Sequence, residues 1–220
     1  MNRIIPYLAR HKEFIGTSTA VITALLLLAY LGDSTDVSPV LQSFITYVGV
    51  FLVIPVLYCK ILLGRPLSSL GFQKGNIWAG VGGSILALSV ALAALFVLWN
   101  FTPLLKDYQL PRAVEEKFLI FVLYEVFVNG FITLLYETFF RGFIMLLWLR
   151  NWGIWSVFFQ AGLFFLLVYL SNGFSPETIP ILLFAPFAGL IAYQARSVWF
   201  SYGASWLFFF FTDALILIFR

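Results

Sequence analysis

Long apolar stretches dominate this sequence and constrain its fold more than any other feature. Seven of them are about 20 residues long or close to it, at residues 14–31, 41–63, 77–99, 118–149, 154–170, 179–193 and 198–219. A helix rises about 1.5 Å per residue, so roughly 20 apolar residues cross a hydrocarbon layer about 30 Å thick. Only 10% of the residues are charged, whereas soluble domains carry about 25%. The sequence therefore excludes a water-soluble fold and predicts an all-α, polytopic bundle of about seven transmembrane helices.

Two of the predicted spans depart from a simple crossing. The stretch at residues 118–149 would be roughly 48 Å long if straight, so we expect it to tilt, to bend at Gly130 or Gly142, or to project beyond the membrane. The stretch at residues 179–193 is short and contains Pro186 and Gly189. Proline breaks helical hydrogen bonding, which predicts a broken or partly re-entrant helix there.

The distribution of Lys and Arg predicts the topology. With the N-terminus inside, nine of the 13 basic residues fall on the cytoplasmic side, as loops retained in the cytoplasm require. We therefore expect a multi-pass protein of the cytoplasmic (inner) membrane, with its C-terminus outside and its first apolar stretch kept as an anchor. The loops are too short for a separate folded unit, so residues 1–220 are expected to form a single integral membrane domain surrounded by the lipid bilayer.

The composition leaves few groups for chemistry. The chain has one histidine, His11, and one cysteine, Cys59, so it cannot form an internal disulfide or a zinc site of His and Cys. A Ser-His-Asp hydrolase would need His11 as its base, yet that residue precedes the first long apolar stretch. A formal charge of +3 is too small to indicate a nucleic-acid partner. We expect no cofactor and no metal.

Ionisable residues inside the apolar stretches are candidates for function because a charge in the bilayer costs several kcal/mol. There are four, Glu125, Glu137, Arg141 and Asp213. Glu137 and Arg141 are four residues apart, the spacing of an ion pair on one helix face, and such a pair can be purely structural. Twelve residues separate Glu125 from Glu137, which in a regular helix places them on different faces. Asp213 is expected to be a helix contact or to face the outer interface.

Residues 136–143 read Tyr-Glu-Thr-Phe-Phe-Arg-Gly-Phe. This run resembles the first motif, Glu-Glu-x-x-x-Arg, of the CAAX protease and bacteriocin-processing family of intramembrane endopeptidases. Residues 65–72 resemble the Leu-Gly-containing loop between two early helices of that family, and residues 155–169 and 184–209 resemble its second-motif and third-motif regions. The resemblance covers about residues 60–210 and implies a core like that of these proteases.

The resemblance also implies site residues, and several are replaced. In the family, the first Glu of the pair and the second-motif His activate a water molecule, and the third-motif His and Asn or Asp support the oxyanion. Here Tyr136 occupies the first Glu position, and Tyr169 ends the stretch that begins at Phe165, where the second-motif His would lie. Ser205 and Phe209 occupy the third-motif positions.

The retained motif residues are Glu137 and Arg141, which are the candidate catalytic pair. Tyrosine is a poor base at neutral pH because its pKa is near 10, whereas Tyr136, Tyr169 and Ser205 can still line a pocket. Phe165 and Phe209 are the other two residues expected to line it. These replacements favour a catalytically degenerate relative of the family over a working protease.

Three functions remain open from the sequence. The first is a non-catalytic, membrane-embedded binding or scaffold subunit that holds a membrane protein or a transmembrane or lipidated peptide. The second is an active, atypical intramembrane endopeptidase that uses Glu137. The third is a small transporter-like membrane subunit, which would need a polar path near the middle of the bilayer.

Overall fold

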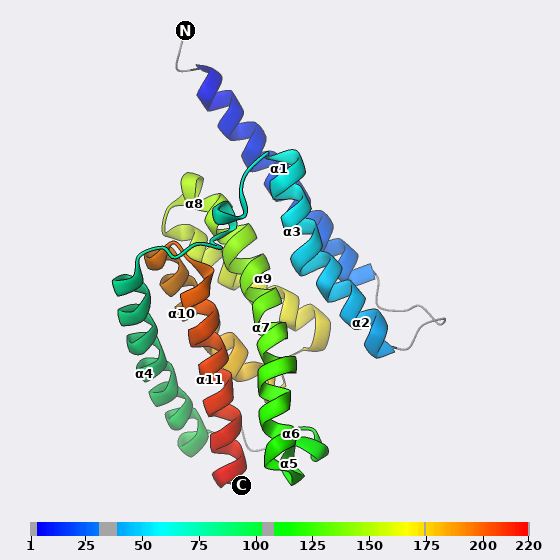
Figure 1. The fold of residues 1–220 in the computed structure, drawn as a ribbon, viewed down its shortest axis with the longest axis vertical. Helices are drawn as coiled ribbons and strands as arrows, with labels where there is room; N and C mark the ends of the chain where they lie inside the picture. Colours follow the sequence, from blue (N-terminus) through cyan, green and yellow to red (C-terminus); the bar gives the residue numbers. More distant parts are fainter. Residues whose placement is uncertain (1–3, 31–38, 103–107, 174, 220) are drawn as a thin grey trace.

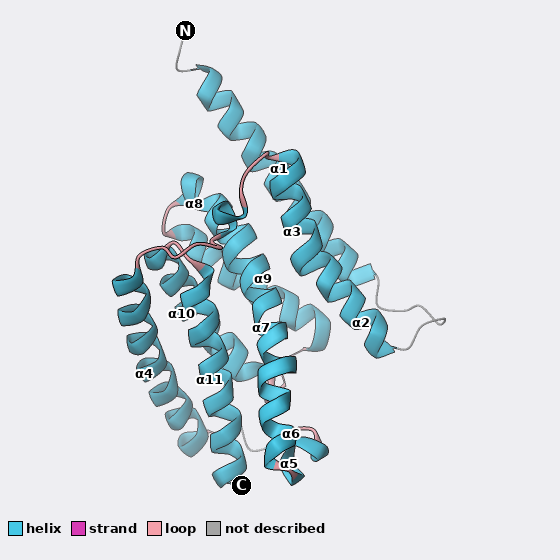
Figure 2. Cartoon of the chain, in the orientation of Figure 1, coloured by secondary structure: helices cyan, strands magenta, loops and turns pink. Residues whose placement is uncertain are grey.

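The computed structural model describes residues 4–30, 39–102, 108–173 and 175–219, and every regular element in them is helical (Figure 1, Figure 2). The predicted all-α fold is confirmed. The α-helices are α1 (Ile4–Tyr30), α2 (Pro39–Val48), α3 (Ile54–Leu57), α4 (Ile77–Phe101), α5 (Arg112–Glu116), α6 (Phe118–Leu123), α7 (Gly130–Tyr136), α8 (Leu146–Trp152), α9 (Trp155–Asn172), α10 (Thr178–Ala195) and α11 (Val198–Phe219). The segments η1 (Gly49–Val53), η2 (Tyr58–Leu62), η4 (Tyr124–Asn129) and η5 (Glu137–Met145) are π-helical, and η3 (Leu67–Leu70) is a 3₁₀-helix.

Five helical stretches in the described residues are long and apolar enough to cross a membrane. They are Phe44–Leu62, Ile77–Phe101, Phe118–Trp152, Thr178–Ala195 and Val198–Phe219. Two shorter apolar helices, Phe14–Leu27 and Trp155–Leu170, coincide with the other two predicted spans. Lengths and compositions of this kind suit a lipid bilayer, and the chain is a multi-pass membrane protein.

The long stretch Phe118–Trp152 alternates between α-helical and π-helical turns. A π-helical turn holds more residues than an α-helical turn, so it changes the direction of every side chain that follows. Gly142 lies in η5 against the loop that carries η3, and a Cβ at this position would be 2.6 Å from the Leu70 carbonyl oxygen. Glycine therefore allows the loop to pack directly on this helix.

The predicted break in the sixth span is wrong. α10 is a continuous helix through Pro186. Proline removes one backbone donor, but α10 packs against α4, α9 and α11, and this packing offsets the lost bond. The helix ends at Arg196, which has a positive φ of 55°.

The turn between α10 and α11 is fixed by the loop that follows η3. The Asn76 N–H donates to the Ala195 carbonyl at 2.8 Å, and the Val198 N–H donates to the Gly71 carbonyl at 3.0 Å. Gly71 has a φ of 83°, a conformation that glycine adopts without strain. These bonds hold the start of α11 beside the helix that carries Glu137.

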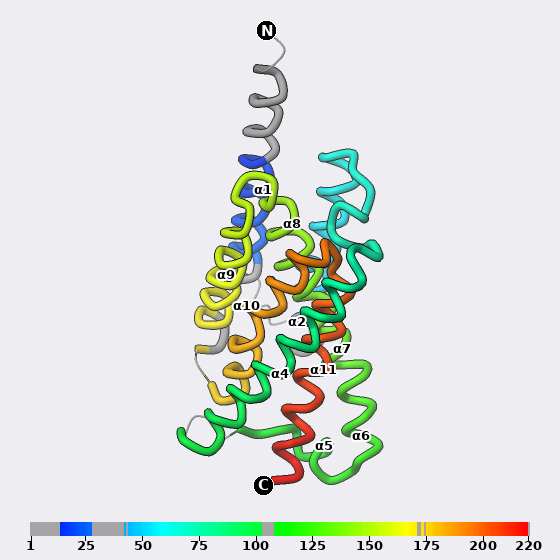
Figure 3. Tube along the Cα trace, turned by 90° about the vertical axis from the view of Figure 1, so that its left-hand side faces the viewer, coloured from blue at the N-terminus to red at the C-terminus, as the bar shows by residue number. Residues whose placement is uncertain are grey.

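The helices form two packed groups on either side of the stretch Phe118–Trp152. α4, α10 and α11 pack against one another, and α4 runs obliquely across the other two (Figure 3). Their shared core includes Ala91, Phe184 and Phe208. On the other side, the α1 helix and the helical stretch Phe44–Leu62 pack against η5 and α9 around Phe51 and Phe140. The stretch that contains Glu125 and Glu137 is therefore central to the bundle.

Candidate functional site

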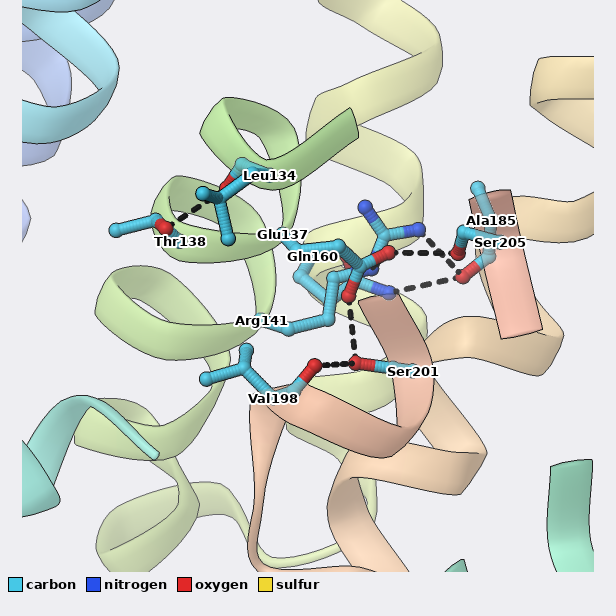
Figure 4. A network of polar contacts seen from close by, with 9 residues as sticks. All are labelled: Leu134, Glu137, Thr138, Arg141, Gln160, Ala185, Val198, Ser201 and Ser205. Atoms are coloured by element: carbon cyan, nitrogen blue, oxygen red, sulfur yellow. Dashed lines mark hydrogen bonds and ion pairs between the residues drawn. The ribbon is translucent and has the colours of Figure 1, made fainter. Parts of the chain in front are cut away.

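Glu137 lies at the centre of a buried polar network between η5 and α11 (Figure 4). Its side chain is almost fully buried, with 1% of the residue exposed. The Ser201 hydroxyl donates to Glu137 Oε2 at 2.6 Å, and the Ser205 hydroxyl donates to Oε1 at 2.8 Å. Ser201 and Ser205 are one turn apart on α11, so both hydroxyls face the same carboxylate.

Arg141 supplies the positive charge of this network. Its Nε lies 3.6 Å from Glu137 Oε1, one helical turn away, and only 3% of the residue is exposed. Its Nη2 donates to the Ala185 carbonyl of α10 at 3.1 Å, and Gln160 Nε2 of α9 donates to the same oxygen at 3.4 Å. Glu137 and Arg141 therefore link η5 to α10 and α11. The ion pair between them was predicted from their spacing of four residues.

Aromatic side chains lie on one side of the network. The Arg141 guanidinium lies 5.5 Å from the centre of the Phe164 ring, a cation–π distance, and the Phe164 ring packs on Phe140 with ring centres 4.8 Å apart. Phe139 and Phe143 are also buried, but they pack toward Phe51 and Tyr58. A general base must reach the water that it activates. Both oxygens of Glu137 already accept hydroxyl donors, so the geometry suits a structural ion pair better than water activation.

The five predicted pocket residues do not converge on one cavity. Ser205 contacts Glu137, but Tyr136 turns to the other side of the helix and packs between Phe51 and Phe164, with ring centres 5.1 and 5.2 Å away. Tyr169 of α9 is 55% exposed. Two further residues complete the predicted set: Phe165, which is 37% exposed, and Phe209, which packs with Phe184 and Phe208.

Two members of the network were missed from the sequence, Ser201 and Gln160. Ser201 lies four residues before Ser205, and this spacing on one face of an apolar helix was the available signal. Gln160 is completely buried, and its Oε1 has no donor among the described residues. It is one of two polar residues in the apolar first half of α9, with Ser156, and this was also visible in the sequence.

A second polar network lies nearer the C-terminal end of α11. Glu125 of η4 is completely buried and Asp213 of α11 is 3% exposed. Asn129 Nδ2 donates to Glu125 Oε2 at 3.0 Å, and Trp206 Nε1 donates to the Glu125 carbonyl at 2.8 Å. The Tyr108 hydroxyl donates to Asp213 Oδ1 at 2.6 Å. Asp213 is a contact between helices, one of the two alternatives raised from the sequence.

The expectation that Glu125 and Glu137 face different directions is wrong, because both face α11. A regular α-helix would rotate them apart by about 120° over twelve residues. The π-helical turn of η4, which lies between the two residues, rotates the chain less per residue and so brings the two side chains back to one side. The stretch Phe118–Trp152 and α11 therefore share two polar sites, one at Glu125 and one at Glu137, which are roughly 18 Å apart along the helix axis.

Tyr108 lies in the segment before α5, outside the helices that are long enough to cross a membrane. Burial, followed by the negative charge of Asp213, raises the pKa of its phenol above the ordinary value. The phenol therefore stays protonated over the physiological range, and its hydroxyl remains a donor to Asp213.

The described residues contain no group of three or more His, Cys, Asp or Glu side chains that could hold a metal ion. An open apolar cleft lies elsewhere on the surface. It has a volume of about 820 Å³ and is lined by α8 and α9, with Trp152, Phe159, Gly162 and Leu166 among its residues. Its lining is almost wholly apolar, and neither polar network contributes to it.

Comparison with known proteins adds no assignment, since no protein family, curated protein or solved structure matches this chain.

Proposed function

We propose that this chain is a catalytically degenerate relative of the CAAX protease and bacteriocin-processing family that acts as a membrane-embedded binding or scaffold subunit. One observation carries the proposal: both oxygens of the buried Glu137 carboxylate accept hydrogen bonds from the hydroxyls of Ser201 and Ser205. The residue that would have to activate water instead links two helices.

The spatial arrangement of the motif segments supports the relationship. Residues 65–72, 136–143 and the start of α11 resemble three separate parts of the family sequence, and they pack on one another through Leu70, Gly142 and Val198. A shift of one helical turn from the sequence-based alignment puts Ser201 and Ser205 at the third-motif positions. These two residues then face the retained motif glutamate, which is the geometry that a His-x-x-x-Asn pair would need to share a site with it.

The cleft between α8 and α9 is the proposed binding surface for a lipidated peptide. It is apolar, opens on the outside of the bundle and has the volume of a small-molecule pocket. Gly162 lies in its wall, and a Cβ at this position would meet no other atom within 4 Å. The small residue therefore keeps the cleft open along α9, where a prenyl or acyl chain could lie.

The test uses the full chain in liposomes and a farnesylated peptide with a photoactivatable group in its prenyl chain. We expect labelling of the cleft in the wild type and strong reduction by Gly162→Trp, which fills the cleft. Gly203→Trp is the matched control, because Gly203 also has no neighbour within 4 Å and lies outside the cleft. Equal labelling of all three proteins would contradict the binding role.

The second candidate is an active, atypical endopeptidase, and one observation favours it. Arg141 Nε and Gln160 Oε1 are buried without a hydrogen-bond partner among the described residues. A donor and an acceptor near Glu137 are what a bound water molecule requires. The same liposomes distinguish the candidates: cleavage of the peptide that Glu137→Gln abolishes would establish the protease, whereas binding without cleavage in both proteins would establish the scaffold.

The proposed location is the cytoplasmic membrane, with the N-terminus inside. The start of α4 and the end of α10 lie at the end of the bundle nearer the N-terminus, whereas α5 lies at the other end (Figure 1). Lys74 and Arg196 adjoin the first two of these helix ends in the sequence, and the rule for cytoplasmic loops assigns such basic residues to the inside. An impermeant maleimide should label Glu116→Cys in intact cells and Lys74→Cys only after permeabilisation. The native Cys59 should not interfere, because it is completely buried. The reverse labelling pattern would mean that the N-terminus lies outside.

A further inference from the structure

The cleft between α8 and α9 changes in polarity along its length. At the turn that joins the two helices, its lining is polar or carries indole groups, from Asn151, Trp152 and Trp155. Farther along α9 the lining is wholly apolar and consists of Phe158, Phe159, Gly162, Leu163 and Leu166. Trp155 is 68% exposed, and exposed tryptophans of membrane proteins gather at the level of the lipid headgroups. The turn is therefore the headgroup end of the cleft, and the rest of it lies in the hydrocarbon layer.

The cleft has the depth of one leaflet. α9 runs away from the end of the bundle nearer the N-terminus (Figure 3). From Trp155 to Leu166 it rises by about 16 Å, at 1.5 Å per residue. The hydrocarbon layer is about 30 Å thick, so one leaflet accounts for roughly 15 Å of it. A lipid chain that starts at the turn and follows α9 would therefore end near the middle of the bilayer.

Aromatic contacts between helices fix the walls of the cleft. Trp152 of α8 meets Phe159 of α9 edge-on, with ring centres 4.2 Å apart, and Phe14 of α1 stacks on Trp152 at 6.0 Å. Gly162 keeps the middle of the groove open, because a Cβ at this position would meet no other atom within 4 Å. The cleft is thus formed before a ligand enters it, which lowers the entropic cost of binding.

The headgroup end of the cleft carries positive charge. Arg150 adjoins Asn151 in the last turn of α8 and is exposed, and neither α8 nor α9 contains an Asp or a Glu. α1 contributes the sequence Arg-His-Lys-Glu at residues 10–13, directly before the Phe14 that stacks on Trp152, and so adds a net positive charge. Basic residues beside a membrane attract anionic lipids. The charge at this end of the cleft therefore favours an anionic headgroup.

We propose that the cleft between α8 and α9 binds an anionic phospholipid of the adjacent leaflet. One acyl chain lies along α9, and the phosphate-bearing headgroup lies at Arg150 and Asn151, which are hydrogen-bond donors. A neutral lipid would use only the apolar groove, and a soluble anion would use only the basic end. The inference uses the cleft of the proposed function but not its peptide ligand, which would have to displace this lipid.

The test uses the full chain in vesicles of phosphatidylcholine that contain a minor fraction of phosphatidylglycerol. Two lipid probes carry the same photoactivatable group in one acyl chain, and one has the phosphatidylglycerol headgroup while the other has the phosphatidylcholine headgroup. Mass spectrometry of the peptides from α9 measures the labelling of the cleft. We expect the anionic probe to label the wild type about fivefold more than the neutral probe, the ratio expected from one basic side chain near the membrane surface.

Three variants separate the headgroup from the groove. Arg150→Gln should bring the ratio of the two labels close to one and leave labelling by the neutral probe unchanged. Lys74→Gln is the matched control, because it removes a positive charge from the loop before α4, which starts at the same end of the bundle (Figure 1), and it should keep the wild-type ratio. Gly162→Trp fills the groove and should reduce labelling by both probes.

Equal labelling of the wild type by the two probes would overturn the proposal and leave only bulk lipid around α9. A ratio that Arg150→Gln leaves unchanged, or that Lys74→Gln lowers as far, would also overturn it. A cleft that neither probe reaches, together with crosslinks between chains at α9, would assign the groove to a second copy of this chain. The measured quantity is a ratio of two lipids, so it can fail while the farnesylated peptide still binds, and the reverse also holds.

Discussion

The carboxylates Glu137 and Glu125 lie on one helical stretch and face the same neighbour, α11, but their surroundings differ in charge. Glu137 has Arg141 one turn away and two serine hydroxyls on its oxygens. Glu125 accepts a hydrogen bond from the Asn129 amide, and no cationic side chain among the described residues pairs with it. The first site is neutral as an ion pair, whereas the second has no counter-charge among the described residues. Burial alone therefore does not determine how a membrane protein holds an acid.

The largest effect should come from removing the cation of the first site. Arg141→Met leaves Glu137 buried without a counter-charge, and we expect it to lower the free energy of unfolding by about 3–5 kcal/mol. Unfolding in mixed detergent micelles, followed by circular dichroism, would measure the loss. The double variant Glu137→Gln/Arg141→Met removes both charges and should recover part of it. A double variant less stable than Arg141→Met would show that charge neutralisation is not what holds this site.

The serine hydroxyls should contribute the next largest amount. Ser201→Ala or Ser205→Ala removes one hydrogen bond to a buried carboxylate, at a cost of about 1.5–3 kcal/mol. Ser84→Ala is the matched control, because its hydroxyl reaches only the Phe200 carbonyl, at 3.4 Å. The same unfolding measurement applies. If Ser84→Ala were as costly as the other two, the special role of the hydroxyls at Glu137 would be refuted.

The sequence predicted the helices and the Glu137–Arg141 pair because both depend on local spacing. About 20 apolar residues specify a span wherever they occur, and four residues specify one helix face. The α-helix of residues 178–195 was harder to predict, because Pro186 suggests a break. Contacts with neighbouring helices kept it continuous, and such contacts are not visible in a single stretch of sequence.

The partners of each acid could not be predicted because they depend on how helices rotate against one another. A regular helix would turn Glu125 and Glu137 apart, but the π-helical turn at η4, which lies between them, aligns them. Helix rotation is also the reason why the prediction for Tyr169 differs from the structure. The alignment placed Tyr169 in a pocket, but its side chain is exposed on α9. Ser201 was the exception, since its spacing of four from Ser205 was visible and only its target, Glu137, was hidden.

The Tyr108 phenol makes the stability of the folded protein depend on pH. Replacing it should lower the free energy of unfolding less than replacing Arg141, Ser201 or Ser205. Burial and the charge of Asp213 raise the pKa of Tyr108, so the folded protein keeps a proton that the unfolded phenol loses near pH 10. The stability that this contributes is complete below about pH 10 and decreases as the pH rises further, by at most about 1.4 kcal/mol per pH unit.

Tyr108→Phe tests this link. At neutral pH it should lower the free energy of unfolding by about 1 kcal/mol, because it removes one hydrogen bond to Asp213. Above about pH 10 the wild type should lose stability faster than the variant, so the two curves should converge. Thermal unfolding in detergent over this range would measure both. Parallel curves would mean that the Tyr108 phenol titrates at its ordinary pKa.

The smallest effect should come from Glu125→Gln, and it separates the two sites most sharply. The amide oxygen can still accept from Asn129, and no ion pair among the described residues is broken, so we expect a change of less than about 1 kcal/mol. Glu137→Gln should be costlier, because it leaves Arg141 buried without its anion. The two substitutions are chemically identical and fall on equally buried residues of one helical stretch. Equal losses of stability would mean that the Arg141 counter-charge does not distinguish the two sites.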